Sequence, residues 1–211
     1  MASASLAAGD PTGWFDRLYA AGACGQVPVP WSRRQPHPLL VQWASARDLS
    51  GTSQRAVVVG CALGADAEYV AALGFDTTGF DISGTAIRLA RQRLGGSAVR
   101  YVVADLLDYP RAWLRAYDLV IEIITVQALP DPPRRQAIAN VSRLVGPGGT
   151  LLVIAAVHDD TTPPTTIPPW PLRRAEIEAF GVDGLTAARI EVTATPGQPD
   201  QRRWLAEFRR Q

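Results

Sequence analysis

Apolar residues along this chain follow two patterns, short apolar runs and longer stretches in which they recur at helical spacing. The run at 56–59 is rich in β-branched residues and predicts a buried strand. It ends in a glycine-containing segment, 60–64, and the helical pattern that follows stops at Gly74. A second strand, 77–80, then ends on Asp81. Strand, glycine turn, helix, strand and carboxylate are typical of the first half of a nucleotide-binding α/β sheet.

The same two patterns continue through the rest of the chain. We expect helices at 82–94, 110–116, 132–145 and 172–180, and strands at 99–104, 118–124, 150–157, 186–194 and 203–208. A glycine-rich turn at 146–149 introduces the fifth strand, and a turn at 196–200 joins the last two strands. The proline- and threonine-rich loop 158–170 is long enough to serve as a lid. The chain is therefore predicted to be an α/β protein.

The N-terminal region has a different composition. Residues 1–12 read as a flexible tail, and residues 14–22 as a short amphipathic helix. A proline-rich passage, 27–40, excludes regular helix, and a helix over 39–49 leads into the first strand. We interpret residues 1–49 as a segment that packs on the core, and residues 50–211 as the single functional domain.

The glycine turn and the carboxylate suggest a specific chemistry. Gly60 and Gly64 allow the backbone to turn sharply and to approach a ligand without a Cβ in the way. The next helix directs its free N–H groups at that ligand. Asp81 would accept hydrogen bonds from two ribose hydroxyls. An ordinary strand-to-helix turn remains the alternative explanation.

Composition narrows the function classes. With 211 residues, of which 47% are hydrophobic, the chain predicts one domain with a full core. It has no signal-peptide pattern and no apolar run of about 20 residues, so we expect no membrane span. Two cysteines form no disulfide framework and indicate a cytoplasmic setting. A net charge of +1 argues against nucleic-acid binding, and no cluster has metal-ligand spacing. The chain contains no lysine, which excludes Schiff-base and P-loop lysine chemistry.

Residues 50–210 resemble the class I S-adenosylmethionine-dependent methyltransferases. The segment 59–64 is similar to their first motif, and Asp81 followed by Ile82 is similar to their ribose-binding site. Asp105 and Leu106 resemble the adenine-binding motif after the third strand. Two further motifs match, 117–122 in the fourth strand and 144–150 before the fifth.

The resemblance implies S-adenosylmethionine as the cofactor, held by Gly60, Cys61, Ala62, Gly64, Asp81, Ile82, Asp105, Leu106 and Glu122. It also implies a Rossmann-like seven-stranded sheet with helices on both faces and an antiparallel C-terminal strand. The chain departs from the family pattern at two positions. Val58 stands where the family often has an acidic residue, and Ala62 replaces the middle glycine of the first motif.

The N-terminal segment is similar to the cap of the thiopurine methyltransferase and tellurite-resistance branch. By that likeness Trp31 packs against the cofactor, and the acceptor is a small molecule. Trp14, His37 and Trp170 are then candidates for the substrate pocket. Ordinary core packing of these tryptophans remains the alternative.

Three residues are candidates for a part in catalysis. Glu122 lies within an apolar strand, where a carboxylate is costly to bury unless it is paired or faces a ligand. His158 follows the fifth strand and is a candidate general base, as is His37. For each of the three a structural role remains open.

These observations predict a methyltransferase that moves a methyl group to a thiol, hydroxyl or amine of a small molecule. Two other functions remain open. A nicotinamide-dependent oxidoreductase has a similar glycine loop and acidic residue, although Asp105 and the closing strand pair argue against it. A cofactor-binding protein without turnover would explain Val58 and Ala62.

Overall fold

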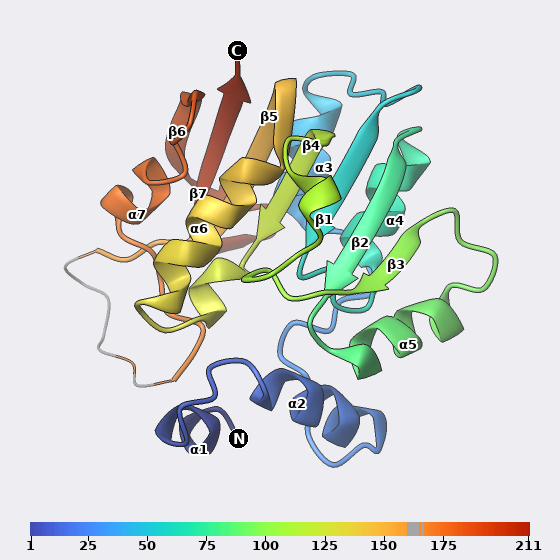
Figure 1. Ribbon diagram of the computed structural model, residues 1–211, viewed down its shortest axis with the longest axis vertical. Coiled ribbons are helices and arrows are strands. Elements are labelled where there is room, and N and C mark those ends of the chain that lie inside the picture. Colours follow the sequence, from blue (N-terminus) through green and yellow to red (C-terminus); the bar gives the residue numbers. More distant parts are fainter. Residues whose placement is uncertain (160–164, 166) are drawn as a thin grey trace.

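A computed structural model describes residues 1–159, 165 and 167–211 of the chain. It contains one seven-stranded sheet with the order β3-β2-β1-β4-β5-β7-β6 (Figure 1). The first five strands pair in parallel, and β7 is antiparallel to both of its neighbours. The strands are β1 (Arg55–Val59), β2 (Asp76–Asp81), β3 (Arg100–Val103), β4 (Tyr117–Ile123), β5 (Val145–Ala156), β6 (Leu185–Thr195) and β7 (Gln198–Arg210). The predicted α/β sheet with an antiparallel C-terminal strand is confirmed.

Both faces of the sheet are buried because apolar side chains alternate along its central strands. Val57 and Val59 belong to the core on the face that α6 (Pro133–Leu144) and α7 (Arg174–Glu178) cover. Ala56 and Val58 belong to the core on the opposite face. The helices on that face are α3 (Pro38–Ser45), α4 (Ala65–Ala72) and α5 (Gly84–Arg93). The expected helices therefore cover both faces (Figure 1).

The N-terminal region crosses the edge of the sheet at which the parallel strands end. In Figure 1, α1 (Ala2–Ala7) and α2 (Trp14–Ala23) lie below this edge, whereas α3 packs behind the sheet. The expectation of a flexible tail over residues 1–12 is wrong. The Ser5 hydroxyl donates to the backbone oxygen of Asp10 at 2.8 Å, and the Asp10 carboxylate accepts from the backbone N–H of Gly13 at 2.7 Å. Such side-chain bonds to backbone groups order short segments that have little core of their own.

Three other boundaries differ from those expected. The segment 146–149 is part of β5, where it forms an irregularity opposite Tyr117–Leu119, and regular pairing begins at Thr150. The helix expected at 110–116 is a single 3-10 turn, η1 (Arg111–Trp113). The last hairpin turns at Pro196 and Gly197, so β7 begins earlier than predicted. Of the proposed lid, 158–170, residues 160–164 and 166 lie outside the described residues.

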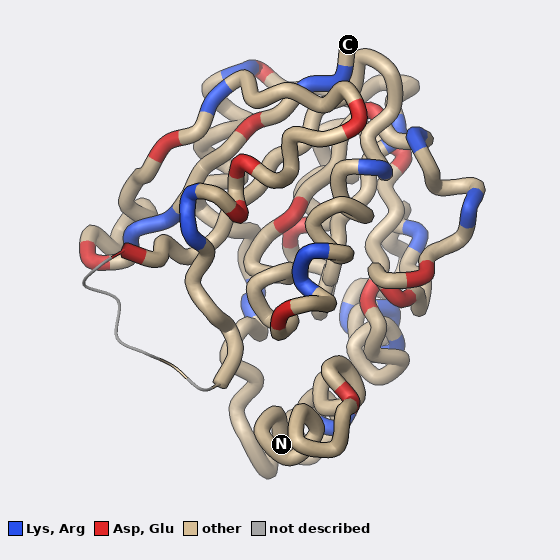
Figure 2. Tube along the Cα trace, turned by 60° about the vertical axis from the view of Figure 1, so that its left-hand side comes forward, with Lys and Arg blue, Asp and Glu red and all other residues tan. Residues whose placement is uncertain are grey.

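Acidic and basic positions are interspersed over the trace in Figure 2, in keeping with a net charge of +1. Among the helices that the structure describes, none combines the length and the apolar character that crossing a bilayer requires.

Candidate active site

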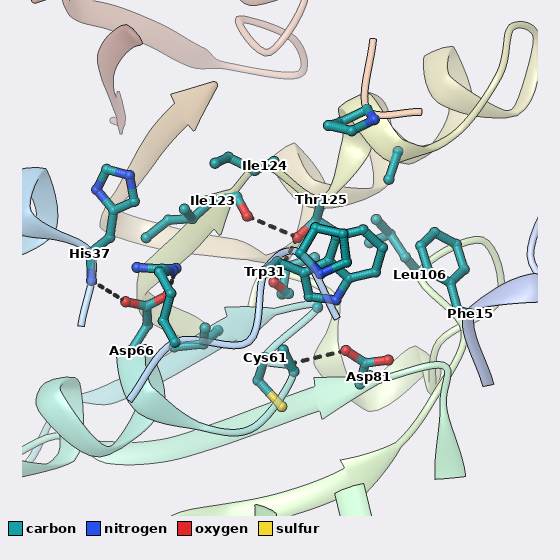
Figure 3. A pocket seen from close by; sticks show the side chains of 18 of the residues that line it. Phe15, Trp31, His37, Cys61, Asp66, Asp81, Leu106, Ile123, Ile124 and Thr125 are labelled. Carbon is teal, nitrogen blue, oxygen red and sulfur yellow. Dashed lines mark hydrogen bonds and ion pairs between the residues drawn. The ribbon is translucent and has the colours of Figure 1, made fainter. Parts of the chain in front are cut away.

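A cavity of about 470 Å³ lies between the ends of the parallel strands and the N-terminal region (Figure 3). The residues that follow β1, β2, β3 and β4 form its floor: 59–62, 81–82, 104–106 and 123–125. Ligands bind at this edge in open α/β sheets because each strand end delivers one loop to a common cleft. Gly60, Cys61, Ala62, Asp81, Ile82, Asp105 and Leu106, all predicted to bind cofactor, are thus brought together.

The glycine loop after β1 depends on its small residues. Gly60 has a φ of +58°, and a Cβ there would lie 2.6 Å from the Thr125 side chain. Ala62 also has a positive φ, +50°, which alanine adopts only at a cost. Gly64 precedes α4, and a Cβ on it would meet the Tyr101 hydroxyl at 2.2 Å. Gly64 is not part of the cavity wall, so its size is needed for packing.

Asp81 is a buried carboxylate at the end of β2. Its Oδ1 accepts from the backbone N–H of Ser83 at 2.9 Å, and its Oδ2 from that of Ala62 at 3.0 Å. Burial raises the pKa of Asp81 to about 6, although the two N–H bonds act in the opposite direction. Because a carboxylate oxygen accepts more than one hydrogen bond, both oxygens retain capacity for a ligand.

Asp105 stands at the equivalent position after β3. Its Oδ1 accepts from the backbone N–H of Leu107 at 2.8 Å, which orients the carboxylate at the cavity wall. Asp81 and Asp105 therefore mark two adjacent strand ends with acidic groups, as the sequence predicted.

Aromatic side chains from the N-terminal region close the cavity opposite the sheet. Phe15, Tyr19 and Trp31 line it, and the Trp31 indole N–H donates to the Tyr19 hydroxyl at 2.7 Å. Trp14 is buried behind them, stacked on Phe15 with ring centroids 4.0 Å apart, and it does not line the cavity. Trp31 thus faces the pocket as expected, whereas Trp14 serves packing.

The Asp16 carboxylate joins α2 in this aromatic wall to the N-terminus of α5. Asp16 in α2 accepts from the Ser83 hydroxyl at 2.6 Å and from the Thr85 backbone N–H at 2.9 Å. These donors lie at the N-terminus of α5, where a negative charge is favoured. They hold the pKa of Asp16 below its usual value. Since Ser83 also bonds to Asp81, the aromatic wall and the floor of the cavity are joined through one turn.

His37 lines the cavity at its other end and caps α3. Its Nδ1 accepts from the Leu39 backbone N–H at 3.2 Å, and its own backbone N–H donates to Asp66 Oδ1 at 2.6 Å. Burial and the charges of Arg33 and Arg203 lower the pKa of His37 to about 3. The ring is therefore neutral, and with Nδ1 occupied its Nε2 carries the proton. His37 offers the cavity a donor.

Glu122 does not line the cavity, although the sequence suggested a role at the ligand. It is fully buried, with Oε1 accepting from the backbone N–H groups of Thr125 at 2.7 Å and Val126 at 3.0 Å. Burial raises its pKa to about 7. These bonds hold the turn at Ile124, whose φ is +62°, and the turn places Ile124 and Thr125 in the wall.

His158 and Trp170 also lie outside the cavity wall. The His158 backbone N–H donates to the backbone oxygen of Leu172 at 2.9 Å, and the Trp170 backbone N–H donates to the backbone oxygen of Gln127 at 2.7 Å. The guanidinium of Arg134 lies 5.4 Å from the Trp170 ring centroid. The neighbouring Pro169 reaches the cavity instead. Neither candidate catalyst, Glu122 or His158, has a side chain at the site.

Sequence reasoning missed several lining residues because no motif marks them. Arg33 and Asp66 form an ion pair of 2.8 Å across the cavity wall. Gln201 and Arg203 reach the wall from the β6–β7 hairpin. The only sequence signal for Asp66 is its position, as an acidic residue in the first turn of the helix after the glycine loop. Gln201 and Arg203 have no such signal.

Comparison with known proteins agrees with this arrangement. Residues 56–149 match the family model of a methyltransferase domain. A ubiquinone biosynthesis O-methyltransferase of Thiobacillus denitrificans is 34% identical over 116 residues, which are 54% of this chain and 48% of that protein. The chain thus matches about half the length of such curated relatives.

Solved structures match over more of the chain. A protein studied for conversion of a disulfide bond into a thioacetal group during echinomycin biosynthesis is 25% identical with a TM-score of 0.73. The match covers 94% of this chain and 91% of that one. The N-methyltransferase NodS of Bradyrhizobium japonicum, in complex with S-adenosyl-L-homocysteine, is 25% identical with a TM-score of 0.65. Here 86% of this chain and 91% of that one are covered.

Proposed function

We propose that this chain is a class I S-adenosylmethionine-dependent methyltransferase and that it transfers a methyl group from S-adenosylmethionine to a small molecule. One observation carries the proposal: a glycine loop and two acidic strand ends, Asp81 and Asp105, meet in one cavity. The cavity, at about 470 Å³, has the size of a cofactor and ligand pocket. A Cβ on Gly60 would meet the Thr125 side chain, so this path of the loop along the cavity wall requires glycine.

The order of the strands suggests how the cofactor would lie. Successive strand ends are about 4.8 Å apart. Asp105 after β3 would bind the adenine amino group, and Asp81 after β2 the ribose hydroxyls. The methionine part would then lie over the loop after β1, near Arg33. The Nη1 of Arg33 is buried without a hydrogen-bond partner and is available for a carboxylate.

The chain itself contributes position and water exclusion. S-adenosylmethionine, when bound, supplies an activated methyl group for direct displacement. Phe15, Tyr19 and Trp31 would shield this methyl group, and Ile124 and Thr125 would hold the acceptor in line with it. His37 has its Nδ1 occupied and its pKa lowered to about 3, and Glu122 lies outside the wall, so neither is placed to take a proton from the acceptor. An acceptor that ionises readily, such as a phenol or thiol, fits this site best.

Oxygen is the acceptor atom that we favour. Curated relatives are named for ubiquinone O-methylation, and the match to this chain covers about half of their length. The suggested likeness to the thiopurine and tellurite-resistance branch rests on the aromatic N-terminal wall and stays a prediction. The same holds for the division of the chain at residue 49, since α3 shares the core of the sheet.

Calorimetry followed by a transfer assay tests the proposal. The protein should bind S-adenosylhomocysteine and not NAD, and should transfer labelled methyl groups to members of a panel of phenols, thiols and amines. Binding of NAD without S-adenosylhomocysteine would favour the oxidoreductase. Tight cofactor binding with no transfer to any acceptor would favour a binding protein without turnover.

A further inference from the structure

The end of the cavity farthest from Asp81 and Asp105 is formed by the β6–β7 hairpin. Thr195, Gln198, Gln201 and Arg203 line it there. Arg203 pairs with Ala156, at the end of β5, so it stands at the same edge of the sheet as the other strand ends. These residues have no part in the cofactor site proposed above.

The guanidinium of Arg203 has an incomplete set of hydrogen-bond partners. Its Nη1 donates to the Arg202 backbone oxygen at 3.1 Å and its Nη2 to Gln201 Oε1 at 2.9 Å, whereas its buried Nε has no hydrogen-bond partner. Within the described part of the chain no carboxylate forms an ion pair with it. Its neighbour Arg202 differs, being paired with Asp159 at 2.7 Å. A partly buried guanidinium without an anion is costly, and binding of an anion would offset that cost.

The surroundings add further positive charge. Arg33, His37 and Arg203 all line the cavity, and the charges of the two arginines both lower the pKa of His37. Burial also lowers the pKa of the Arg203 guanidinium. The charge of Arg33 is balanced by Asp66, so the uncompensated cation at this end of the cavity is Arg203.

Distance separates Arg203 from the proposed cofactor groups. In the sheet β7 lies three strands away from β1, which is about 14 Å. The ribose would be held at β2, on the other side of β1. The methionine chain would therefore end near Arg33, and the sulfonium, being a cation, would not be attracted to Arg203. The remaining occupant of this end is the methyl acceptor.

We propose that Arg203 binds a carboxylate of the acceptor, so that the substrate class is small phenols that carry a carboxylate. The proposal rests on the methyltransferase function proposed above. The Gln201 amide holds the guanidinium, and the Nε2–H of His37 supplies a neutral donor nearby. Apolar wall residues, among them Ile123, Ile124 and Pro169, would receive the ring of such an acceptor.

Calorimetry on the protein saturated with S-adenosylhomocysteine tests this assignment with two probes, 3,4-dihydroxybenzoate and its neutral amide. The acid should bind at least tenfold more tightly than the amide. In Arg203→Gln the affinity for the acid should fall to that for the amide, while the affinity for S-adenosylhomocysteine stays unchanged. Arg203→Lys should retain part of the preference, and Arg202→Gln, the matched control, should behave as the wild type.

Several results would overturn the assignment. Equal binding of acid and amide to the wild type would do so without any variant, as would binding of neither. A loss of S-adenosylhomocysteine affinity in Arg203→Gln would assign the arginine to the cofactor. An equal effect of Arg202→Gln would reduce the result to general surface charge. Failure of the proposed function is distinct, because S-adenosylhomocysteine would then not bind to the wild type at all.

Discussion

Cofactor affinity should depend on pH through Asp81. This carboxylate has a pKa of about 6 in the folded protein because it is buried. In the proposed cofactor site ribose hydroxyls would donate hydrogen bonds to it, and these bonds would favour the ionised form. Binding must therefore be accompanied by loss of the Asp81 proton below pH 6, and the affinity should fall as the pH is lowered.

The size of this effect follows from the pKa. At pH 7 about nine-tenths of the molecules have Asp81 ionised, and at pH 5 about one in eleven. The affinity should consequently drop about tenfold between pH 7 and pH 5, equivalent to about 1.4 kcal/mol. Between pH 7 and pH 8 it should be nearly constant as far as Asp81 is concerned.

Isothermal titration calorimetry with S-adenosylhomocysteine from pH 5 to pH 8 measures the effect. Asp81→Asn is the control, since it removes the titrating group while it keeps a side chain of the same shape. The variant should bind at least tenfold more weakly at pH 7, because a charged acceptor is lost. The variant's affinity should lack the tenfold drop between pH 7 and pH 5 that is assigned to Asp81. The difference between the two curves removes contributions of Glu122 and of the ligand itself.

Two outcomes would refute this reasoning. A wild-type affinity that does not change between pH 5 and pH 7 would mean that Asp81 is not coupled to the ligand. An Asn variant with unchanged affinity at pH 7 would exclude Asp81 from the binding site altogether.

Three further changes have definite expected outcomes. Gly60→Ala should lower the melting temperature and weaken cofactor binding, with a loss of about 1–2 kcal/mol in each free energy, because φ is +58° there. Gly95→Ala, at a position with open space around it, is the control. Asp16→Ala should weaken cofactor binding in calorimetry about fivefold, by releasing α2 from α5, with urea unfolding of the core little changed. Glu122→Gln should reduce the pH dependence of the free energy of unfolding, measured by urea denaturation. The raised pKa of Glu122, about 7, makes the wild type lose up to about 3 kcal/mol as the pH rises from 4.5 to 7, and an equal loss in the variant would contradict this.

The fold could be predicted because local signals agreed along the chain. The central strands are short β-branched runs, and their alternation between two buried faces leaves few other arrangements. Predictions failed where order comes from single polar contacts. The helix α1 and the loop before α2 depend on Ser5 and Asp10, which a pattern of apolar positions does not register.

Buried polar residues were the second source of error. Glu122 stands out in the sequence because it interrupts an apolar strand, and this suggested chemistry at the ligand. In the fold its Oε1 satisfies two backbone N–H groups of the next turn. The sequence shows that such a carboxylate needs a partner, but the partner is a backbone whose path is known only from the structure.

The two halves of the cavity also differ in how far sequence predicts them. The half proposed to hold the cofactor comes from one continuous strand–helix–strand unit and the next strand end, so that Gly60, Asp81 and Asp105 are separated by spacings that the sheet itself imposes. The acceptor half combines the N-terminal wall, the turn after β4 and the β6–β7 hairpin. Its residues are distant in sequence and share no spacing, and Arg203 is one of several arginines on that hairpin. Arg203 differs from Arg202 in that it lines the cavity and has no carboxylate partner among the described residues, a property of the fold alone. Specificity for the acceptor therefore has to be inferred from the balance of buried charge.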